Sequence, residues 1–317
     1  MVTDNWIVAV FVLMVLVFAA TAPGFVSAEN WVATAQYTTE YLLLALGETF
    51  VILTAGIDLS VGATLGLAGI LGGTAVSLLT NGGQGGDVAV GMLGGLFVSL
   101  LTGTAVGVFN GLCITLLDIT PFIVTLGSLG IVSGVTFLIT NGADVTTLPF
   151  VTGSLGNHAY FGVLPLPVVV TLAVTVLSSL LLTHTRFGLR TYAIGSNSEA
   201  ARRTGISVKR HLVAVYALCG LFAGLAGYLV MLRFVAASPI AGQNDELDAI
   251  AAVVIGGASL FGGRGKILGT TVGAFIIATL VSGLILLNVT AYWQTVLTGG
   301  IIILAVFVDQ RRRARVP

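Results

Sequence analysis

The sequence has no lysine or arginine in its first 185 residues, and it carries little charge anywhere. Charged residues make up 8% of the chain and hydrophobic residues 56%, whereas about 25% of the residues of a typical soluble domain are charged. The composition therefore excludes a soluble globule, and apolar runs such as residues 6–22 indicate membrane spans. Because the formal net charge is zero, nothing favours a nucleic acid as partner.

Cysteine and histidine are also scarce. Cys113 and Cys219 lie within apolar stretches, where we expect packing residues rather than a disulfide. The three histidines are scattered, without metal-ligand spacing or a grouping typical of nucleophilic catalysis. A phosphate-binding loop of the form G-xxxx-G-K-[ST] is absent, because Leu260 and Ile267 occupy two of its required positions. The sequence predicts a protein that is not an enzyme and binds no metal or cofactor itself.

The basic residues that do occur predict the orientation. Of 13 in the chain, six lie between residues 186 and 210 and four between residues 311 and 315. Basic residues near the ends of spans stay in the cytoplasm, so we expect both clusters inside the cell. The apolar runs then predict ten spans, near residues 6–22, 40–55, 61–80, 89–116, 122–140, 164–184, 212–232, 246–262, 267–287 and 292–309. The chain is expected to be an all-α, multi-pass protein of the cell membrane, with one domain over residues 1–317 and both termini cytoplasmic.

The span at 246–262 is short and rich in glycine, and a re-entrant hairpin is the alternative. A hairpin would leave the cluster at 311–315 outside, so a crossing segment is preferred. Many of the 42 glycines recur four apart, as at Gly103 and Gly107, and such spacing favours close helix packing within the chain or between subunits. Glycine-bearing breaks at 56–62 and 256–265 resemble each other in outline, as in inverted repeats of transporters.

The basic loop at 186–210 has the signals of a short helix. Asn197 and the serines beside it can cap a helix, Glu199 favours its first turn and Arg202 its last, and Gly205 supplies a stop. The alternative is a solvated turn anchored by positive charge. We prefer a polar helix outside the bilayer, because a simple linker would not need these signals.

Three stretches resemble a known family. Glu199-Ala200-Ala201, followed after three residues by Gly205, resembles the EAA-xxx-G core of the cytoplasmic coupling loop of ABC-transporter permeases. Residues 54–62 (TAGIDLSVG) resemble the signature of permeases of the ribose/xylose/galactose type. Residues 246–265 resemble a segment that these proteins share with branched-chain amino-acid permeases. The resemblance runs from about residue 40 to the C-terminus.

This resemblance implies a permease subunit of a binding-protein-dependent importer that brings a simple sugar into the cytoplasm. The implied partners are a second permease subunit, identical or paralogous, an ATP-binding subunit that holds ATP and Mg, and an external solute-binding protein. The alternatives are the same assembly carrying branched-chain amino acids or nucleosides, and a secondary transporter in which Glu48 and Asp58 bind a proton or sodium ion. The residues expected to contact the ATP-binding subunit are Glu199, Ala200, Ala201, Arg202 and Gly205.

Polar residues within the spans are candidates for the solute path. Carboxylates are costly in a bilayer, so Glu48 and Asp58 must face protein or water. Asp58 has two interpretations, a cap for the span that begins near Val61 or a polar lining of the path. Asn110 is the third candidate, with hydrogen bonding between helices as the alternative role.

Two segments are candidates for docking the solute-binding protein. Asp245, Glu246 and Asp248 are expected on the outer face, either as the start of a capped helix or as a docking patch. The long outer loop at 141–165 is the other candidate.

Overall fold

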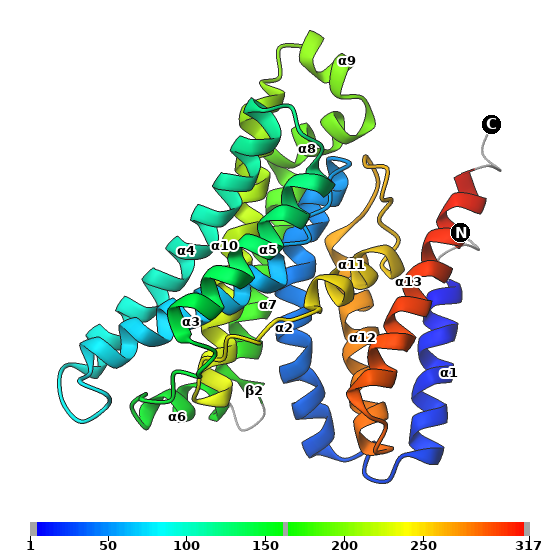
Figure 1. Ribbon diagram of the computed structural model, residues 1–317. Coiled ribbons are helices and arrows are strands. Elements are labelled where there is room, and N and C mark those ends of the chain that lie inside the picture. Colours follow the sequence, from blue (N-terminus) through cyan, green and yellow to red (C-terminus); the bar gives the residue numbers. More distant parts are fainter. Residues whose placement is uncertain (1–4, 161–163, 314–317) are drawn as a thin grey trace.

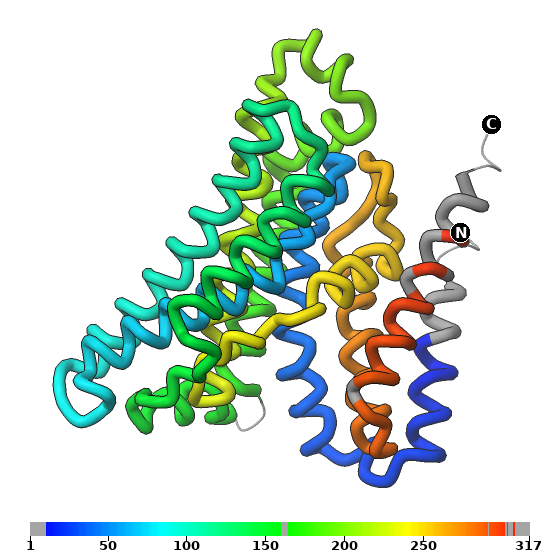
Figure 2. Tube along the Cα trace, in the orientation of Figure 1, coloured from blue at the N-terminus to red at the C-terminus, as the bar shows by residue number. Residues whose placement is uncertain are grey.

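The computed structural model describes residues 5–160 and 164–313, and Figure 2 follows its Cα trace. The first half of the chain forms α1 (Asn5–Thr21), α2 (Ala28–Leu53), α3 (Val61–Leu79), α4 (Val88–Leu116), α5 (Pro121–Thr140) and α6 (Val151–Asn157). Two strands, β1 (Ala159–Tyr160) and β2 (Leu164–Pro165), then pair antiparallel. The second half forms α7 (Leu166–His184), α8 (Arg186–Ser196), α9 (Ser198–Arg203), α10 (Val208–Phe234), α11 (Asp245–Ile255), α12 (Ile267–Leu286) and α13 (Ala291–Arg313).

Six helices of the described chain are long and apolar enough to cross a membrane, namely α3, α4, α5, α7, α10 and α12. Their bounds agree with the predicted spans to within a few residues. The predicted all-helical class is confirmed apart from the short strand pair. The chain is a multi-pass membrane protein, and ten crossings with cytoplasmic ends stay a prediction.

Local sequence determines where several helices begin. The amides of Ala89 and Val90 donate to Oδ1 of Asp87 at 2.9 and 3.2 Å, which caps α4. Proline stands at the first position of α5, where its missing N–H costs nothing. Ser27 caps α2 by accepting from the amide of Asn30, so this helix begins twelve residues before the predicted span at 40–55.

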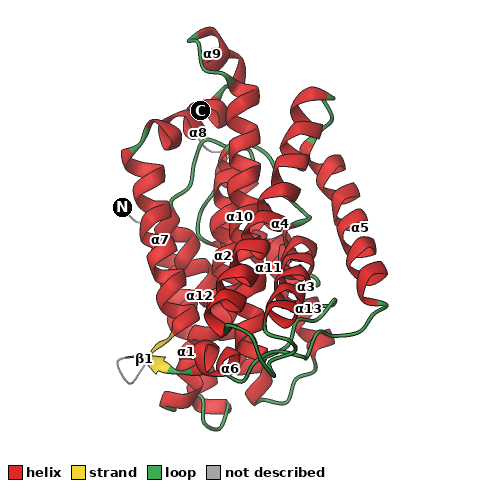
Figure 3. Ribbon diagram, turned by 90° about the vertical axis from the view of Figure 1, so that its left-hand side faces the viewer, coloured by secondary structure: helices red, strands yellow, loops and turns green. Residues whose placement is uncertain are grey.

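The helices are arranged so that both halves of the chain return to one end (Figure 1). The short helices α8 and α9 lie at that end, and the start of α1 and the end of α13 point towards it. Helix α6 lies at the opposite end. Figure 3 shows α5 at one edge of the molecule, and only 22% of the residues in its apolar 18-residue stretch are buried.

The predicted span at 246–262 is wrong in its extent. Helix α11 has 11 residues and is therefore about 16 Å long, roughly half the thickness of a bilayer core. It ends at Ile255 because Gly257, two residues later, adopts a φ of 86°, which a helix does not accommodate. Gly262 and Gly263, in the loop that follows, also have positive φ values of 84° and 72°. Before it, residues 235–244 run without a helix from the end of α10 to a point about halfway along the bundle (Figure 1).

The core is built on glycine contacts between α4 and α10. A β-carbon at Gly103 would meet the carbonyl oxygen of Gly220 and would lie 2.8 Å from Cα of Gly224. Helices in lipid gain stability from such close approach, because no hydrophobic drive brings them together. By contrast, a β-carbon at Gly130 or Gly134 of α5 would meet no described atom within 4 Å. The glycine spacing therefore accompanies close helix packing between α4 and α10 but not on α5.

Candidate functional site

Helices α8 and α9 form a capped, two-part element at the end of the bundle. The amides of Phe187 and Gly188 donate to Oγ1 of Thr185 at 3.1 and 3.4 Å, which caps α8. The amide of Ala200 donates to Oδ1 of Asn197 at 2.9 Å, which caps α9. Gly205 follows with a φ of 85°. The predicted short polar helix is confirmed, and α8 is an additional helix within the same loop.

The charged residues of α9 form one exposed group. Glu199 accepts hydrogen bonds from Nη2 of Arg202 at 2.9 Å and from Nε of Arg203 at 3.2 Å. These bonds, with that of Arg202 the stronger cause, hold the pKa of the Glu199 carboxyl below its usual range. The side chains of Arg202 and Arg203 are 70% and 78% exposed, whereas Ala201 is buried. An exposed ion pair stabilises little, so this group offers an accessible charged surface rather than stability.

The end of α8 contacts the end of α2 and the glycine-bearing break at 256–265. A β-carbon at Gly195 would meet the carbonyl oxygen of Leu53 at the end of α2 and would lie 2.6 Å from the amide of Gly263. That amide donates to the same Leu53 oxygen at 2.9 Å. The hydroxyl of Tyr192 donates to the carbonyl of Gly265 at 2.7 Å. The element that carries α9 is therefore packed directly against the end of α2 and the loop between α11 and α12.

The three predicted path residues come together in a sealed cluster. Glu48, Asp58 and Asn110 are 0%, 2% and 0% exposed. Oδ1 of Asp58 accepts from the amide and the hydroxyl of Ser60 at 2.9 and 2.6 Å. Nδ2 of Asn110 donates to the Ser60 hydroxyl at 2.8 Å, and the Asp58 amide approaches Oε2 of Glu48 at 3.5 Å. The cluster therefore links α2 and α4 to the non-helical segment that precedes α3.

In this conformation the cluster is closed to a solute. Ser60 is the residue before α3 and makes no side-chain cap, so Asp58 stabilises the turn ahead of the helix rather than the first helical amides. Asn110 links α4 to that turn, which agrees with its alternative role in hydrogen bonding between segments. A contact with solute stays a prediction for all three residues.

The acidic residues of α11 lie inside the bundle. The expected position on the outer face is wrong, because α11 begins about halfway along the long helices (Figure 1). Glu246 is buried, and Asp245 and Asp248 are half-buried. Asp245 lies beside Glu40, and Asp248 lies beside Thr298. Their docking role stays a prediction, as does that of the 141–165 loop, which contains α6 and the strand pair.

A polar pocket of about 150 Å³ opens beside α11. Its walls come from α3, α5 and the end of the non-helical segment, and the residues that line it are Ala63, Leu129, Ser133, Thr136, Phe137, Pro239, Ala241, Gln243, Asn244 and Glu246.

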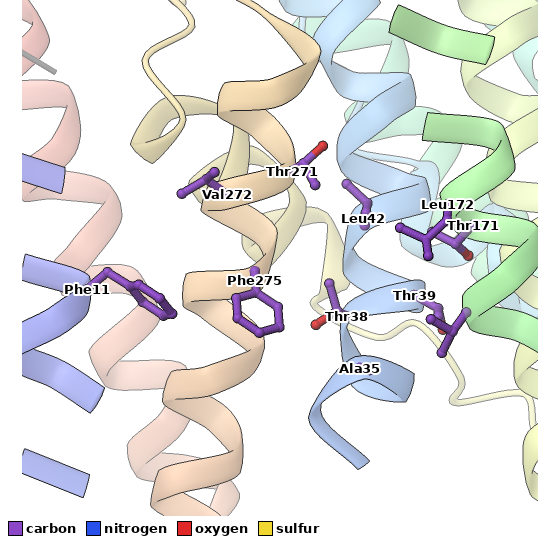
Figure 4. A pocket seen from close by; sticks show the side chains of 11 residues that line it. Phe11, Ala35, Thr38, Thr39, Leu42, Thr171, Leu172, Thr271, Val272 and Phe275 are labelled. Carbon is purple, nitrogen blue, oxygen red and sulfur yellow. The ribbon is translucent and has the colours of Figure 1, made fainter. Parts of the chain in front are cut away.

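A larger groove of about 470 Å³ lies between α1, α2, α7 and α12 (Figure 4). Phe11, Leu42, Leu172 and Phe275 are among the side chains that line it. The hydroxyls of Thr38, Thr39 and Thr271 all donate to carbonyls of their own helices. This groove is therefore apolar in character.

Residues 30–306 match the protein family described as branched-chain amino acid transport system / permease component. The chain belongs to this permease family. The permease is 38% identical to the ribose import permease protein RbsC of Escherichia coli K12 over 312 residues, which cover 97% of this chain and 93% of the relative. It is 40% identical to RbsC of Bacillus subtilis strain 168, covering 95% and 91%. It is 37% identical to the D-allose transport system permease protein AlsC of E. coli K12, covering 95% and 90%. No solved structure matches the chain.

Sequence reasoning missed several residues of the permease that the structure brings to these sites. Tyr192 and Gly195 were part of the basic loop, and their contacts with the end of α2 and with the break at 256–265 become visible only in three dimensions. Gln243 and Asn244 stand directly before the acidic residues, and a helix does begin at Asp245, as one of the two expectations for these acids had it. The positive φ values of Gly242 and Asn244, 75° and 73°, show that the chain turns directly before this helix. The Gly-x-Asn pair was the signal that could have indicated this turn.

Proposed function

We propose that this permease is the membrane-spanning subunit of an ATP-driven importer that carries a simple sugar into the cytoplasm. The observation that carries this proposal is the similarity, over 95–97% of the chain, to permeases named for ribose and allose. A neutral sugar needs hydrogen-bonding groups along its path rather than a charged trap. The composition, with 8% charged residues, agrees with such a path.

The proposed topology has ten crossings. Residues 235–244 and α11 together form one of them, and α1, α2 and α13 add three to the six long apolar helices. With this count α8, α9 and both chain ends face the cytoplasm. The basic residues of α9 support this orientation through the positive-inside rule.

The proposed partners are a second permease subunit, an ATP-binding subunit with its ATP and Mg, and an external solute-binding protein. The exposed residues Glu199, Ala200, Arg202 and Gly205 would contact the ATP-binding subunit, while Ala201 anchors α9 to the bundle. Movement of α9 would reach the end of α2 and the loop after α11 through Gly195 and through the hydrogen bond from Tyr192. These two contacts give an ATP-driven movement a route to both halves of the chain.

The test is uptake by vesicles that hold the complete assembly with its solute-binding protein. We expect labelled ribose, allose or xylose to accumulate only when ATP is supplied on the side of α9, and to be insensitive to ionophores. Uptake that continues without ATP and stops when an ion gradient is collapsed would contradict the proposal and favour an ion-coupled transporter.

The same vesicles test the coupling role of α9. Glu199→Ala removes the group that holds Arg202 and Arg203, and we expect ATP-driven uptake to fall roughly tenfold, within the usual range of coupling energies between sites. Glu29→Ala is the matched control, because Glu29 is an exposed acid in the first turn of α2 at the opposite end (Figure 1). Equal uptake by the two variants would remove the coupling role.

A further inference from the structure

The segment that leads into α11 exposes polar groups at a depth where lipid cannot satisfy them. Residues 235–244 have no helix, and they end about halfway along the long helices (Figure 1). The side chains of Gln243 and Asn244 are exposed. Non-helical backbone within a membrane occurs only where it is buried in protein or lines a water-filled cavity. The exposed face of this segment must therefore face water or a partner subunit rather than lipid.

The segment is held in place from behind by α3. A β-carbon at Gly62 would meet the carbonyl oxygen of Gly242 and would lie 2.5 Å from Oε2 of Glu246, and one at Gly66 would lie 2.8 Å from the carbonyl oxygen of Ala241. This close approach fixes the backbone directly before Gln243 and Asn244. Gln243 and Asn244 are consequently presented on a rigid support, as a binding site requires.

The polar pocket is the space into which this face opens. Its polar lining consists of two amides, two hydroxyls and one carboxylate, contributed by Gln243, Asn244, Ser133, Thr136 and Glu246. Amides and hydroxyls both donate and accept hydrogen bonds, as sugar hydroxyls do. The volume of about 150 Å³ is smaller than the roughly 300–1,000 Å³ of sites for drug-sized ligands. The pocket therefore suits part of a small polyol.

The larger groove offers no comparable chemistry. Three of its four threonine hydroxyls, at positions 38, 39 and 271, are bonded to their own helices, and only that of Thr171 has no partner within the described chain. It has no amide or carboxylate in its lining, and aromatic and aliphatic side chains dominate its walls (Figure 4). A sugar that entered this groove would lose hydrogen bonds to water without replacement. The polar pocket and the apolar groove thus differ in the solute that they can accept.

We propose that the pocket between α3, α5 and residues 239–246 is a solute-contact site, in which Gln243 and Asn244 hydrogen-bond the hydroxyls of the passing sugar. Ser133 contacts the same sugar from α5, and Glu246 accepts a hydrogen bond from it, whereas the hydroxyl of Thr136 donates to the carbonyl of Val132 at 2.8 Å. This inference rests on the proposed function, since it names the residues that the transported sugar meets.

The test compares two double variants in the reconstituted assembly. Gln243→Ala with Asn244→Gly removes both amides, and glycine keeps the positive φ of 73° at position 244 without strain. Gln84→Ala with Asn81→Gly is the matched control, since both residues are exposed in the turn after α3 and Asn81 has a φ of 49°. ATP-driven uptake of ribose, allose and xylose is measured together with ATP hydrolysis stimulated by the solute-binding protein.

We expect the pocket variant to lower uptake at least about tenfold, as loss of a hydrogen-bonding site for hydroxyls does in other sites, with a raised KM and ATP hydrolysis close to that of the unmodified protein. The control is expected to change neither. Uptake by the pocket variant equal to that of the control would overturn the inference. An equal fall in uptake and hydrolysis would also overturn it, because it would show a structural role. Failure of the proposed function is distinguishable, since the unmodified protein would then show no ATP-driven uptake.

Discussion

The polar residues on the two sides of α3 have opposite environments. On the side of α4 and α10, glycines interlock and the polar residues Asp58 and Asn110 are sealed. On the side of α5 and residues 239–246, Gly62 and Gly66 of α3 also approach backbone closely, but β-carbons on the glycines of α5 would meet no described atom within 4 Å. Polar side chains line an open pocket on this side.

The difference shows that polarity within the bundle is not by itself a sign of a solute path. The side-chain amide of Asn110 donates a hydrogen bond to the Ser60 hydroxyl at 2.8 Å, within the protein. Asn244 has a similar side chain, but its amide is exposed and faces the pocket. Exposure at membrane depth, rather than residue type, distinguishes the group that holds the fold from the group that is free to bind.

The largest expected effect tests the interlocked glycines. Gly103→Val places a branched side chain against backbone atoms of Gly220 and Gly224, and such overpacking costs about 3 kcal/mol or more when the backbone cannot move away. We expect loss of monodisperse protein after extraction in detergent. Gly134→Val on α5 is the control, because a β-carbon there meets no described atom within 4 Å. Equal yields of the two variants would show that α4 is packed no more tightly at Gly103 than α5 is at Gly134.

A smaller effect is expected from the sealed cluster. Asn110→Leu leaves the Ser60 hydroxyl and the Asp58 carboxylate with one donor fewer, and a buried group without its partner costs about 1–3 kcal/mol. We expect a lower temperature of thermal inactivation in detergent. Gln243→Leu on the open side is expected to stay within about 0.5 kcal/mol of the unmodified protein, as surface substitutions usually do. The reverse order of stabilities would show that the open pocket, and not the cluster, maintains the fold.

Much of the fold follows from the sequence because apolar runs and capping residues act locally. The long helices α3, α4 and α10 follow directly from such runs, and α9 from Asn197 and Gly205. The extent of α11 could not be predicted from the sequence. Its apolar residues continue the pattern of a span, whereas the glycines after Ile255 end the helix.

The candidate sites were predicted less completely than the helices. The carboxylates Glu48 and Asp58 attract notice through their cost in a membrane, but only the fold reveals that they are sealed. Gln243 and Asn244 carry no charge, and their importance comes from the turn at Gly242 and from the approach of Gly62 on another helix. Such contacts between distant segments have no local signal in one sequence.

The central claim is that the charged element around α9 faces the cytoplasm, where a partner drives it. The direct measurement is labelling with a membrane-impermeant maleimide in intact spheroplasts, using chains in which Cys113 and Cys219 are replaced by alanine. Arg203→Cys tests α9, and Phe150→Cys at the start of α6 marks the opposite end, since both positions are highly exposed (Figure 1). The account predicts that Phe150→Cys is labelled at once and Arg203→Cys only after the membrane is permeabilised. Labelling of Arg203→Cys from the external medium would contradict it.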